Sequence, residues 1–407
     1  MPEHSMRLGF LAYPWTLLEE GSEKAVDTMV DHCGCNALLV NSNYHSARLL
    51  RPRSAGPKTL QLPGPVSAFE PNPACYNSQA WMPTPDRQLA RAHIVESVQE
   101  ACRARDVDFG LWTVGLHNSR LGKRHPDLCV KNCFGDVYTY ALCPSHPEVH
   151  GYLEGLVKDL CQQFHPRHLV VEAVGYLGLR HGVHHELFMM PWSETLEMLS
   201  SLCFCPSCVR QSEGEGIDTG SLHERVTAWA TQLMTEERGQ HRPAFSQSET
   251  AALLLDTPDL WAFMQWRASV VTQLVESLDA VAQVHEVSLE VIPASFHRPT
   301  SRAWIEGVSL PGVAAACDGF VIPAYFESAA EVSADLSWVR SHAEGPVSTV
   351  LNAASPALEV SAALVDQAAA CQASECVGIY YYNYGLLTPR RLNWVAEANE
   401  RLRKDRS

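Results

Sequence analysis

The stretch that decides the fold is His168-Leu169-Val170-Val171-Glu172, an apolar run that ends in a carboxylate. Four to eight largely apolar residues are typical of a parallel strand whose sheet is covered by helices on both faces. In α/β barrels and open α/β sheets, the chemistry lies at the carboxyl ends of the strands. Glu172 is therefore the first candidate for a catalytic residue.

Similar strand-like runs recur along the chain, and a helical pattern follows each of them. They cover residues 7–13, 37–40, 107–114, 168–172, 287–294, 319–324, 347–351 and 377–382. Eight right-handed strand-and-helix units close a (β/α)8 barrel. The alternative is an open doubly wound sheet, but the first strand-to-helix turn, Tyr13-Pro14-Trp15, lacks a glycine-rich phosphate loop. We predict the α/β class and a (β/α)8 TIM barrel.

We expect one barrel domain over residues 1–407, with long loop insertions after strands two, three and four. The first insertion covers residues 44–86 and is rich in Pro, Gly and Ser without a sustained period. The second covers residues 119–143, and the third, over residues 175–257, holds most of the cysteine and histidine motifs. All three leave the same end of the barrel, where they can surround a substrate.

The composition is that of a globular protein, with 46% hydrophobic and 19% charged residues. A net charge of -15 without a long basic run argues against a nucleic-acid partner. No apolar run reaches eighteen residues, and residues 1–10 lack a signal-peptide core, so we expect no membrane partner. Fourteen cysteines without a secretory signal indicate reduced thiols and a cytoplasmic protein. A homo-oligomer stays open.

The expected strand ends are rich in neutral hydrogen-bonding side chains and aromatic rings, and hold few charges. Apolar ring faces beside neutral donors and acceptors suit a sugar, although Tyr and Trp also fill barrel interiors. We therefore predict a small carbohydrate substrate. The residues predicted to hold its hydroxyl groups are His45, His117, Asn118, His181, His185, Tyr325 and Asn383.

Glu172 is predicted to be a general acid, because burial raises a carboxyl pKa towards the neutral range. The alternative is a structural Glu that an arginine of a neighbouring strand neutralises. Glycoside hydrolysis normally needs a second carboxylate about 5–10 Å away, and Glu327 is the best-placed candidate. Substrate-assisted hydrolysis, or Asp136 or Glu186 reaching in from a loop, is left open.

The cysteine motif Cys203-Phe204-Cys205-Pro206-Ser207-Cys208 places three thiols within six residues. Such thiols can converge on one tetrahedral zinc ion, which needs a fourth ligand from elsewhere. We choose Cys143, which ends the loop after strand three, and Cys129 and Cys133 are rivals in the same loop. The predicted Zn²⁺ site is closed and structural. The alternative is four small buried side chains without a metal.

Two functions other than glycoside hydrolysis are considered. His181, His184, His185 and Glu186 could bind a metal in a metal-dependent hydrolase or lyase, or could instead form a polar wall. The third possibility is a non-catalytic sugar-binding barrel, because strand seven ends without an acid.

Cys143-Pro144-Ser145, Glu172 and the Cys-x-Cys-x-x-Cys motif together resemble the family 42 glycoside hydrolases, zinc-containing β-galactosidases on a (β/α)8 barrel. The resemblance covers about residues 110–210. It implies Cys143, Cys203, Cys205 and Cys208 as zinc ligands and Glu172 as the acid/base.

This chain departs from the family at two positions. Val171 stands where the family has Asn, and strand seven offers Asn352 in place of a nucleophilic Glu. The whole chain is similar to bacterial barrel proteins described only as glycosidase-like.

Overall fold

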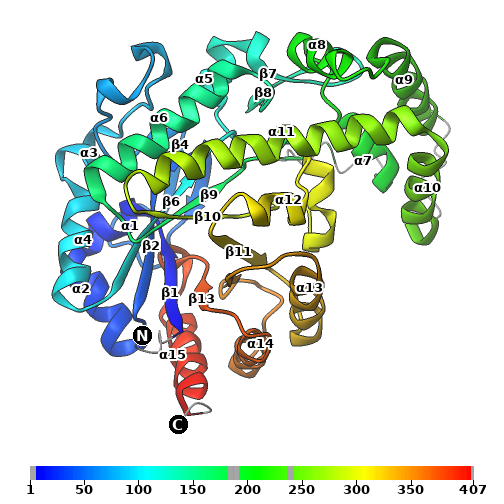
Figure 1. Ribbon diagram of the computed structural model, residues 1–407. Helices are drawn as coiled ribbons and strands as arrows, with labels where there is room; N and C mark the ends of the chain where they lie inside the picture. Colours follow the sequence, from blue (N-terminus) through cyan, green and yellow to red (C-terminus); the bar gives the residue numbers. More distant parts are fainter. Residues whose placement is uncertain (1–5, 182–186, 188–191, 236–242, 405–407) are drawn as a thin grey trace.

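The computed structural model of the chain describes residues 6–181, 187, 192–235 and 243–404. Eight parallel strands close into a barrel, which confirms the predicted fold (Figure 1). They are β1 (Arg7–Ala12), β2 (Ala37–Tyr44), β6 (Asp108–Val114), β9 (His168–Glu172), β10 (Ser288–Val291), β11 (Gly319–Ala324), β12 (Val347–Leu351) and β13 (Gly378–Tyr381). Strand β1 pairs with both β2 and β13, and these two pairings close the ring.

The apolar run that opened the sequence analysis forms β9, between β6 and β10. Leu169, Val170 and Val171 are almost completely buried, whereas the two end residues of the strand are only half-buried. His168 therefore lies at the N-terminal end of the barrel and Glu172 at its C-terminal end.

Helices form the outer layer of the barrel. They are α1 (Pro14–Glu20), α2 (Ser22–Asp27), the π-helix η1 (Thr28–His32), α3 (Arg87–Arg91), α4 (Ile94–Ala104), α6 (Pro147–Phe164), α11 (Pro258–Gln283), α12 (Leu310–Ala315), α13 (Ala329–His342), α14 (Ser361–Ala373) and α15 (Pro389–Lys404). Local signals fix several of them: α6 has Pro147 at its first turn, and α13 begins at a capping box of Ser328 and Glu331.

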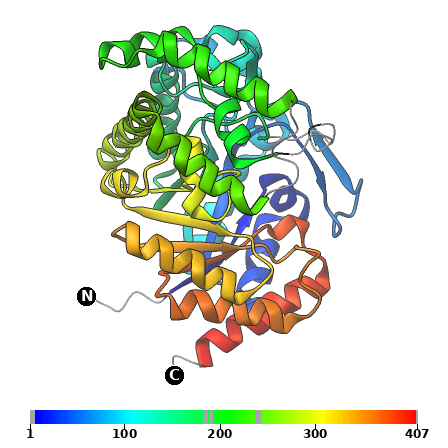
Figure 2. The ribbon, with the colours of Figure 1, turned by 90° about the vertical axis from the view of Figure 1, so that its right-hand side faces the viewer.

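The first insertion has more structure than predicted. It contains a hairpin of β3 (Ala47–Leu50) and β4 (Thr59–Leu62), then β5 (Val66–Ser67), η2 (Pro73–Cys75) and η3 (Gln79–Trp81). The hairpin projects at the right of Figure 2. Its strands have four residues each, of which half are exposed, so they lack the long alternation that reveals a strand in a sequence. Strand β2 runs to Tyr44, so it includes the polar residues that follow the apolar run of residues 37–40.

The other two insertions are folded as well. The one after β6 contains α5 (Ser119–Arg124), η4 (Pro126–Leu128) and a hairpin of β7 (Cys129–Lys131) and β8 (Val137–Leu142). The one after β9 contains α7 (Glu194–Ser200), α8 (Pro206–Gly214), α9 (Thr219–Thr235) and α10 (Pro243–Asp256). In both views, α8 and α9 lie far from α14 and α15 (Figures 1 and 2). Within the described residues, no helix combines the length and apolar composition that a membrane span needs.

Candidate active site and metal centre

Glu172 ends β9, and its carboxyl group is half-buried. The indole Nε1 of Trp112, on the neighbouring β6, donates a hydrogen bond of 2.8 Å to Oε2 of Glu172. Burial raises the pKa of Glu172 to about 7, and the nearby charge of Glu306 adds to the rise. The Trp112 hydrogen bond and the charge of Arg298 oppose the rise. Near pH 7, this carboxyl group can therefore both give and take a proton.

Aromatic side chains from the ends of other strands surround this carboxyl group. The hydroxyl of Tyr13 bonds to that of Tyr44 at 2.7 Å and to that of Tyr382. The ring centre of Trp112 lies 5.6 Å from that of Tyr44 and 6.3 Å from that of Tyr382. Tyr325, half-buried, lies 5.6 Å from Tyr382, centre to centre. Rings with hydroxyl tips offer both apolar faces and hydrogen bonds, as a sugar requires.

A buried network of charged residues includes Glu306, which lies close enough to Glu172 to raise its pKa. Oε1 of Glu306 accepts a hydrogen bond of 2.9 Å from Nδ1 of His297, and His297 Nε2 lies 3.0 Å from Glu197. Although burial opposes both shifts, these contacts raise the pKa of His297 to about 9 and lower that of Glu306 to about 2. Glu306 also accepts backbone N–H groups from Ser295 and Phe296. The carboxylate of Glu306 therefore stabilises the segment that follows β10.

Three of the predicted sugar-binding histidines come together at the ends of β2 and β6 and after β9. The rings of His45 and His117 stack 4.2 Å apart, and Nδ1 of His117 lies 2.9 Å from Nε2 of His181. Burial lowers the pKa of all three, that of His181 to about 4. They are neutral at pH 7 and form a polar wall. In the described ranges, the metal-type cluster is made of cysteines and does not include these histidines.

The other predicted sugar-binding residues are placed differently. Asn118 is buried, accepts the N–H of Leu121 and donates to the hydroxyl of Tyr152. Asn383 is also buried and accepts the N–H of Gly385, while its Nδ2 has no hydrogen-bond partner within the described ranges. The two amides thus help to shape the loops, and whether either touches substrate stays a prediction.

The second predicted carboxylate, Glu327, is exposed in the segment between β11 and α13. Among the described carboxylates, only Glu306 lies close enough to raise the pKa of Glu172. His184, His185 and Glu186 lie outside the described residues. The predicted roles of Glu327 and His185 therefore stay predictions.

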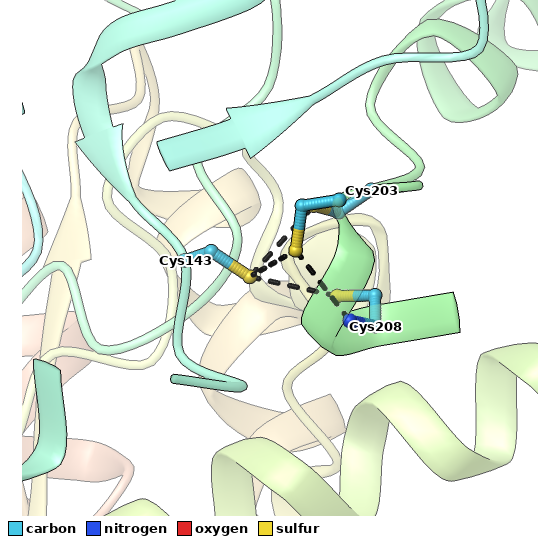
Figure 3. Close-up of side chains that lie close together, drawn as sticks. Cys143, Cys203 and Cys208 are labelled. Carbon is cyan, nitrogen blue, oxygen red and sulfur yellow. Dashed lines mark hydrogen bonds between the residues drawn. The ribbon is translucent and has the colours of Figure 1, made fainter. Parts of the chain in front are cut away.

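The four predicted cysteines converge in the interior. Figure 3 shows three of them, Cys143, Cys203 and Cys208, with their sulfurs pointing toward one another. Cys143 follows β8, and its Sγ lies 3.7, 3.8 and 3.5 Å from the sulfurs of Cys203, Cys205 and Cys208. Four sulfurs around one zinc, with Zn–S of about 2.3 Å, are about 3.8 Å apart. A disulfide would instead need about 2.05 Å. The cysteine that joins Cys203, Cys205 and Cys208 is therefore Cys143, as predicted.

Local structure aims these sulfurs inward. Pro206 opens α8, and Cys205 caps the helix by accepting the N–H of Cys208 at 3.5 Å. The N–H of Lys131 donates to Cys203 Sγ at 3.4 Å. Backbone N–H groups stabilise the thiolate form, which is the form that binds a metal.

The buried positive charge of Arg267 indicates independently of the cysteine geometry whether a metal fits these residues. This arginine of α11 is fully buried, and its guanidinium lies 4.5 Å above the ring of Tyr176, whose hydroxyl is 3.9 Å from Cys208 Sγ. Among the described residues, its hydrogen bonds go to Met264 and to backbone carbonyls, not to a carboxylate. A buried cation needs a compensating anion. Four thiolates around a divalent ion carry a net charge of -2 and would supply it.

No protein-family model matches the chain, and no curated protein matches its sequence. Its fold neighbours among solved structures are glycoside hydrolases. The catalytic domain of β-amylase from Paenibacillus polymyxa superposes with a TM-score of 0.59 and 12% identity, over 99% of both chains. The PgaB (BpsB) glycoside hydrolase domain from Bordetella bronchiseptica gives 0.56 and 12%, over 95% of this chain and 97% of that one. β-Galactosidase from Marinomonas ef1 gives 0.59 and 9%, over 98% of this chain and 60% of that one. At such identities the likeness shows the barrel fold.

The sequence analysis missed Arg298, Glu306 and Glu197. No strand-end rule points to Glu197 on α7 or to Glu306 in η6 (Thr300–Glu306). Arg298 follows the predicted ring residue His297 directly, so its position could have been read as part of the ring. That Arg298 has no hydrogen-bond acceptor among the described residues could not be predicted from the sequence.

A cavity of about 1080 Å³ opens at the other, N-terminal end of the barrel. Among its lining residues, Arg7 bonds to Glu290 at 2.8 Å, and the His168 ring lies 3.2 Å from Glu290 and 3.4 Å from Asp108. These charges neutralise one another, and this end of a barrel usually serves stability. We therefore place the candidate active site at the opposite end, in spite of the size of this cavity.

Proposed function

We propose that the protein is a glycoside hydrolase that acts on a small glycoside or oligosaccharide, with Glu172 as the acid/base. The observation that supports this most strongly is a half-buried carboxyl with a pKa of about 7 among tyrosine and tryptophan rings at the C-terminal barrel end. A general acid works best when its pKa lies near the working pH.

The chemistry follows from the position of Glu172. In its protonated form, Glu172 gives its proton to the glycosidic oxygen while the bond from that oxygen to the anomeric carbon breaks. In its ionised form, it takes a proton from the water that attacks the anomeric carbon. The tyrosine hydroxyls and the neutral histidines would hold the sugar hydroxyls.

The decisive variant is Glu172→Gln, which keeps the shape and removes the proton. We expect turnover of the best 4-nitrophenyl glycoside in a screen to fall by about 10²- to 10⁴-fold. The ordinary circular dichroism spectrum should remain. Glu327→Gln, assayed beside it, tests the second carboxylate and should also lose turnover if Glu327 is that group. Normal turnover in Glu172→Gln would remove the proposed mechanism.

We also propose that Cys143, Cys203, Cys205 and Cys208 hold a structural zinc in a layout like that of family 42. When bound, the ion would link the segment after β8 to the start of α8. Mass spectrometry of the purified protein should find about one zinc per chain, absent from Cys205→Ser. Cys129→Ser is the matched control and should keep the metal. Zinc that survives in Cys205→Ser would contradict this site.

A non-catalytic sugar-binding barrel is the second candidate. It is favoured by one observation: among the described carboxylates, Glu306 is the one that raises the pKa of Glu172, and Glu306 is already engaged by His297, while Glu327 is exposed. This candidate predicts that sugars bind to the wild type and to Glu172→Gln alike, without being cleaved.

A further inference from the structure

Arg298 lies near the candidate acid and has no hydrogen-bond acceptor among the described residues. It follows β10 in the chain, is half-buried, and lies with its guanidinium 4.5 Å above the ring centre of Tyr325. It is close enough to Glu172 to lower the pKa of that carboxyl. Within the part of the chain that the structure describes, Arg298 makes no hydrogen bond and no ion pair, and its Nε is buried without an acceptor.

Two other half-buried arginines, Arg7 and Arg302, differ from Arg298 in this respect. Arg7 pairs with Glu290, and Arg302 pairs with Glu197. The charge of Arg298 lowers the pKa of two carboxyl groups, Glu172 and Asp335, but both have other hydrogen-bond donors. Glu172 accepts from Trp112, and Asp335 accepts both the N–H and the hydroxyl of Thr300. Removing a guanidinium from water without giving it an acceptor costs free energy. A ligand that supplies the acceptor would recover this cost.

We propose that Arg298 binds the carboxylate of a uronic acid, so that the substrate is an acidic glycoside. The inference rests on the proposed glycosidase function and narrows its substrate class. A guanidinium offers paired donors in one plane, which match the two oxygens of a carboxylate. The guanidinium covers one face of Tyr325, and the ring centre of Tyr382 lies 5.6 Å from that of Tyr325, so an aromatic ring stands close to the guanidinium for a sugar ring to pack against.

The proposal has a consequence for the acid itself. The positive charge of Arg298 lowers the pKa of Glu172 in the free protein. A bound carboxylate neutralises that charge, so the pKa of Glu172 should rise when the acidic substrate binds. Glu172 would then be more fully protonated in the complex, at the stage at which it must give its proton.

The test compares the 4-nitrophenyl α- and β-glycosides of glucuronic and galacturonic acid with those of glucose and galactose. In the wild type, kcat/KM of one uronide should exceed that of its neutral counterpart at least tenfold. In Arg298→Met this ratio should fall to about one, and Arg298→Lys, which keeps the charge but not the planar fork, should lie between them. Arg87→Gln, at an exposed arginine of α3, is the matched control and should keep the wild-type ratio.

Several outcomes would overturn the proposal. Equal kcat/KM values for uronides and neutral glycosides in the wild type would do so and leave the glycosidase function standing. So would an unchanged preference in Arg298→Met. If no glycoside is cleaved, calorimetry with glucuronate, galacturonate and glucose separates the two ideas: Arg298-dependent binding of a uronate supports the anion site although the hydrolase has failed. Tighter binding of glucose 6-sulfate than of either uronate would overturn the carboxylate and indicate a sulfated sugar.

Discussion

The pKa of a buried glutamate is shifted in opposite directions at the two ends of the barrel. At the N-terminal end, Glu290 is buried against Arg7 and His168. Burial works against its ionisation, but these two neighbours keep the pKa of Glu290 below its ordinary value. At the C-terminal end, the one hydrogen bond to Glu172 from the described residues comes from Trp112, and burial raises its pKa to about 7.

The difference separates stability from chemistry. A carboxylate that has cationic partners stays ionised at neutral pH and stabilises the folded state above its unfolded pKa. A carboxyl without them is held in an unfavourable environment, which costs stability but leaves a proton that can be exchanged. Glu172 and Glu290 therefore predict opposite effects of the same Glu-to-Gln substitution.

Glu290→Gln should give the largest change in stability. It removes the ion-pair partner of Arg7 and leaves His168 with Asp108 alone, and breaking a buried pair costs about 3–5 kcal/mol. Urea unfolding at pH 7 measures this loss. Because the pKa of Glu290 is lowered, the wild type should lose this stability as the pH falls below about 4.3, and the variant should not. Equal stability of the two proteins at pH 7 would contradict the assigned role.

Glu172→Gln should have the opposite sign. Because the folded pKa of about 7 exceeds the unfolded value of about 4.3, the wild type loses stability as the pH rises between these values. The variant should therefore be more stable than the wild type by about 3–4 kcal/mol at pH 8, and nearly equal to it at pH 4. Urea unfolding at both pH values measures the difference, and a variant that is less stable at pH 8 would count against a raised pKa.

Arg267→Met extends the comparison to a second unpaired arginine. If the thiolate centre is the counter-charge of Arg267, the variant should hold its metal about tenfold less tightly, which is about 1.4 kcal/mol. Competition with a chromophoric chelator measures the affinity, and the absorption spectrum of the cobalt-substituted protein shows whether four sulfurs still bind. Arg87→Met is the surface control. Unchanged affinity would mean that Arg267 does not compensate the centre.

Tyr44→Phe should give the smallest effect. It removes one hydroxyl from the buried pair with Tyr13, and a typical hydrogen bond contributes about 0.5–1.5 kcal/mol. Thermal unfolding measures the loss. A much larger loss would show that the tyrosine hydroxyls depend on one another as a network.

Much of the fold could be predicted from the sequence, because a barrel strand and its helix each leave a local pattern. The run from His168 to Glu172 identified a central strand, and eight such units implied a closed barrel. The hairpin of residues 47–62 left no such pattern, because its strands are short and half exposed. Its pairing depends on contacts between the two strands, which local periodicity does not encode.

The candidate site divides in the same way. The sequence by itself determined Glu172 at a strand end and the three spaced thiols of residues 203–208, since both depend on neighbours along the chain. Only the tertiary structure decided that Cys143, and not Cys129 or Cys133, completes the cluster. It also decided that Glu306 is engaged by His297, while Arg298 finds no acceptor in the described part of the chain. Whether a charge is paired depends on residues far away in the sequence, and folding alone brings those residues together.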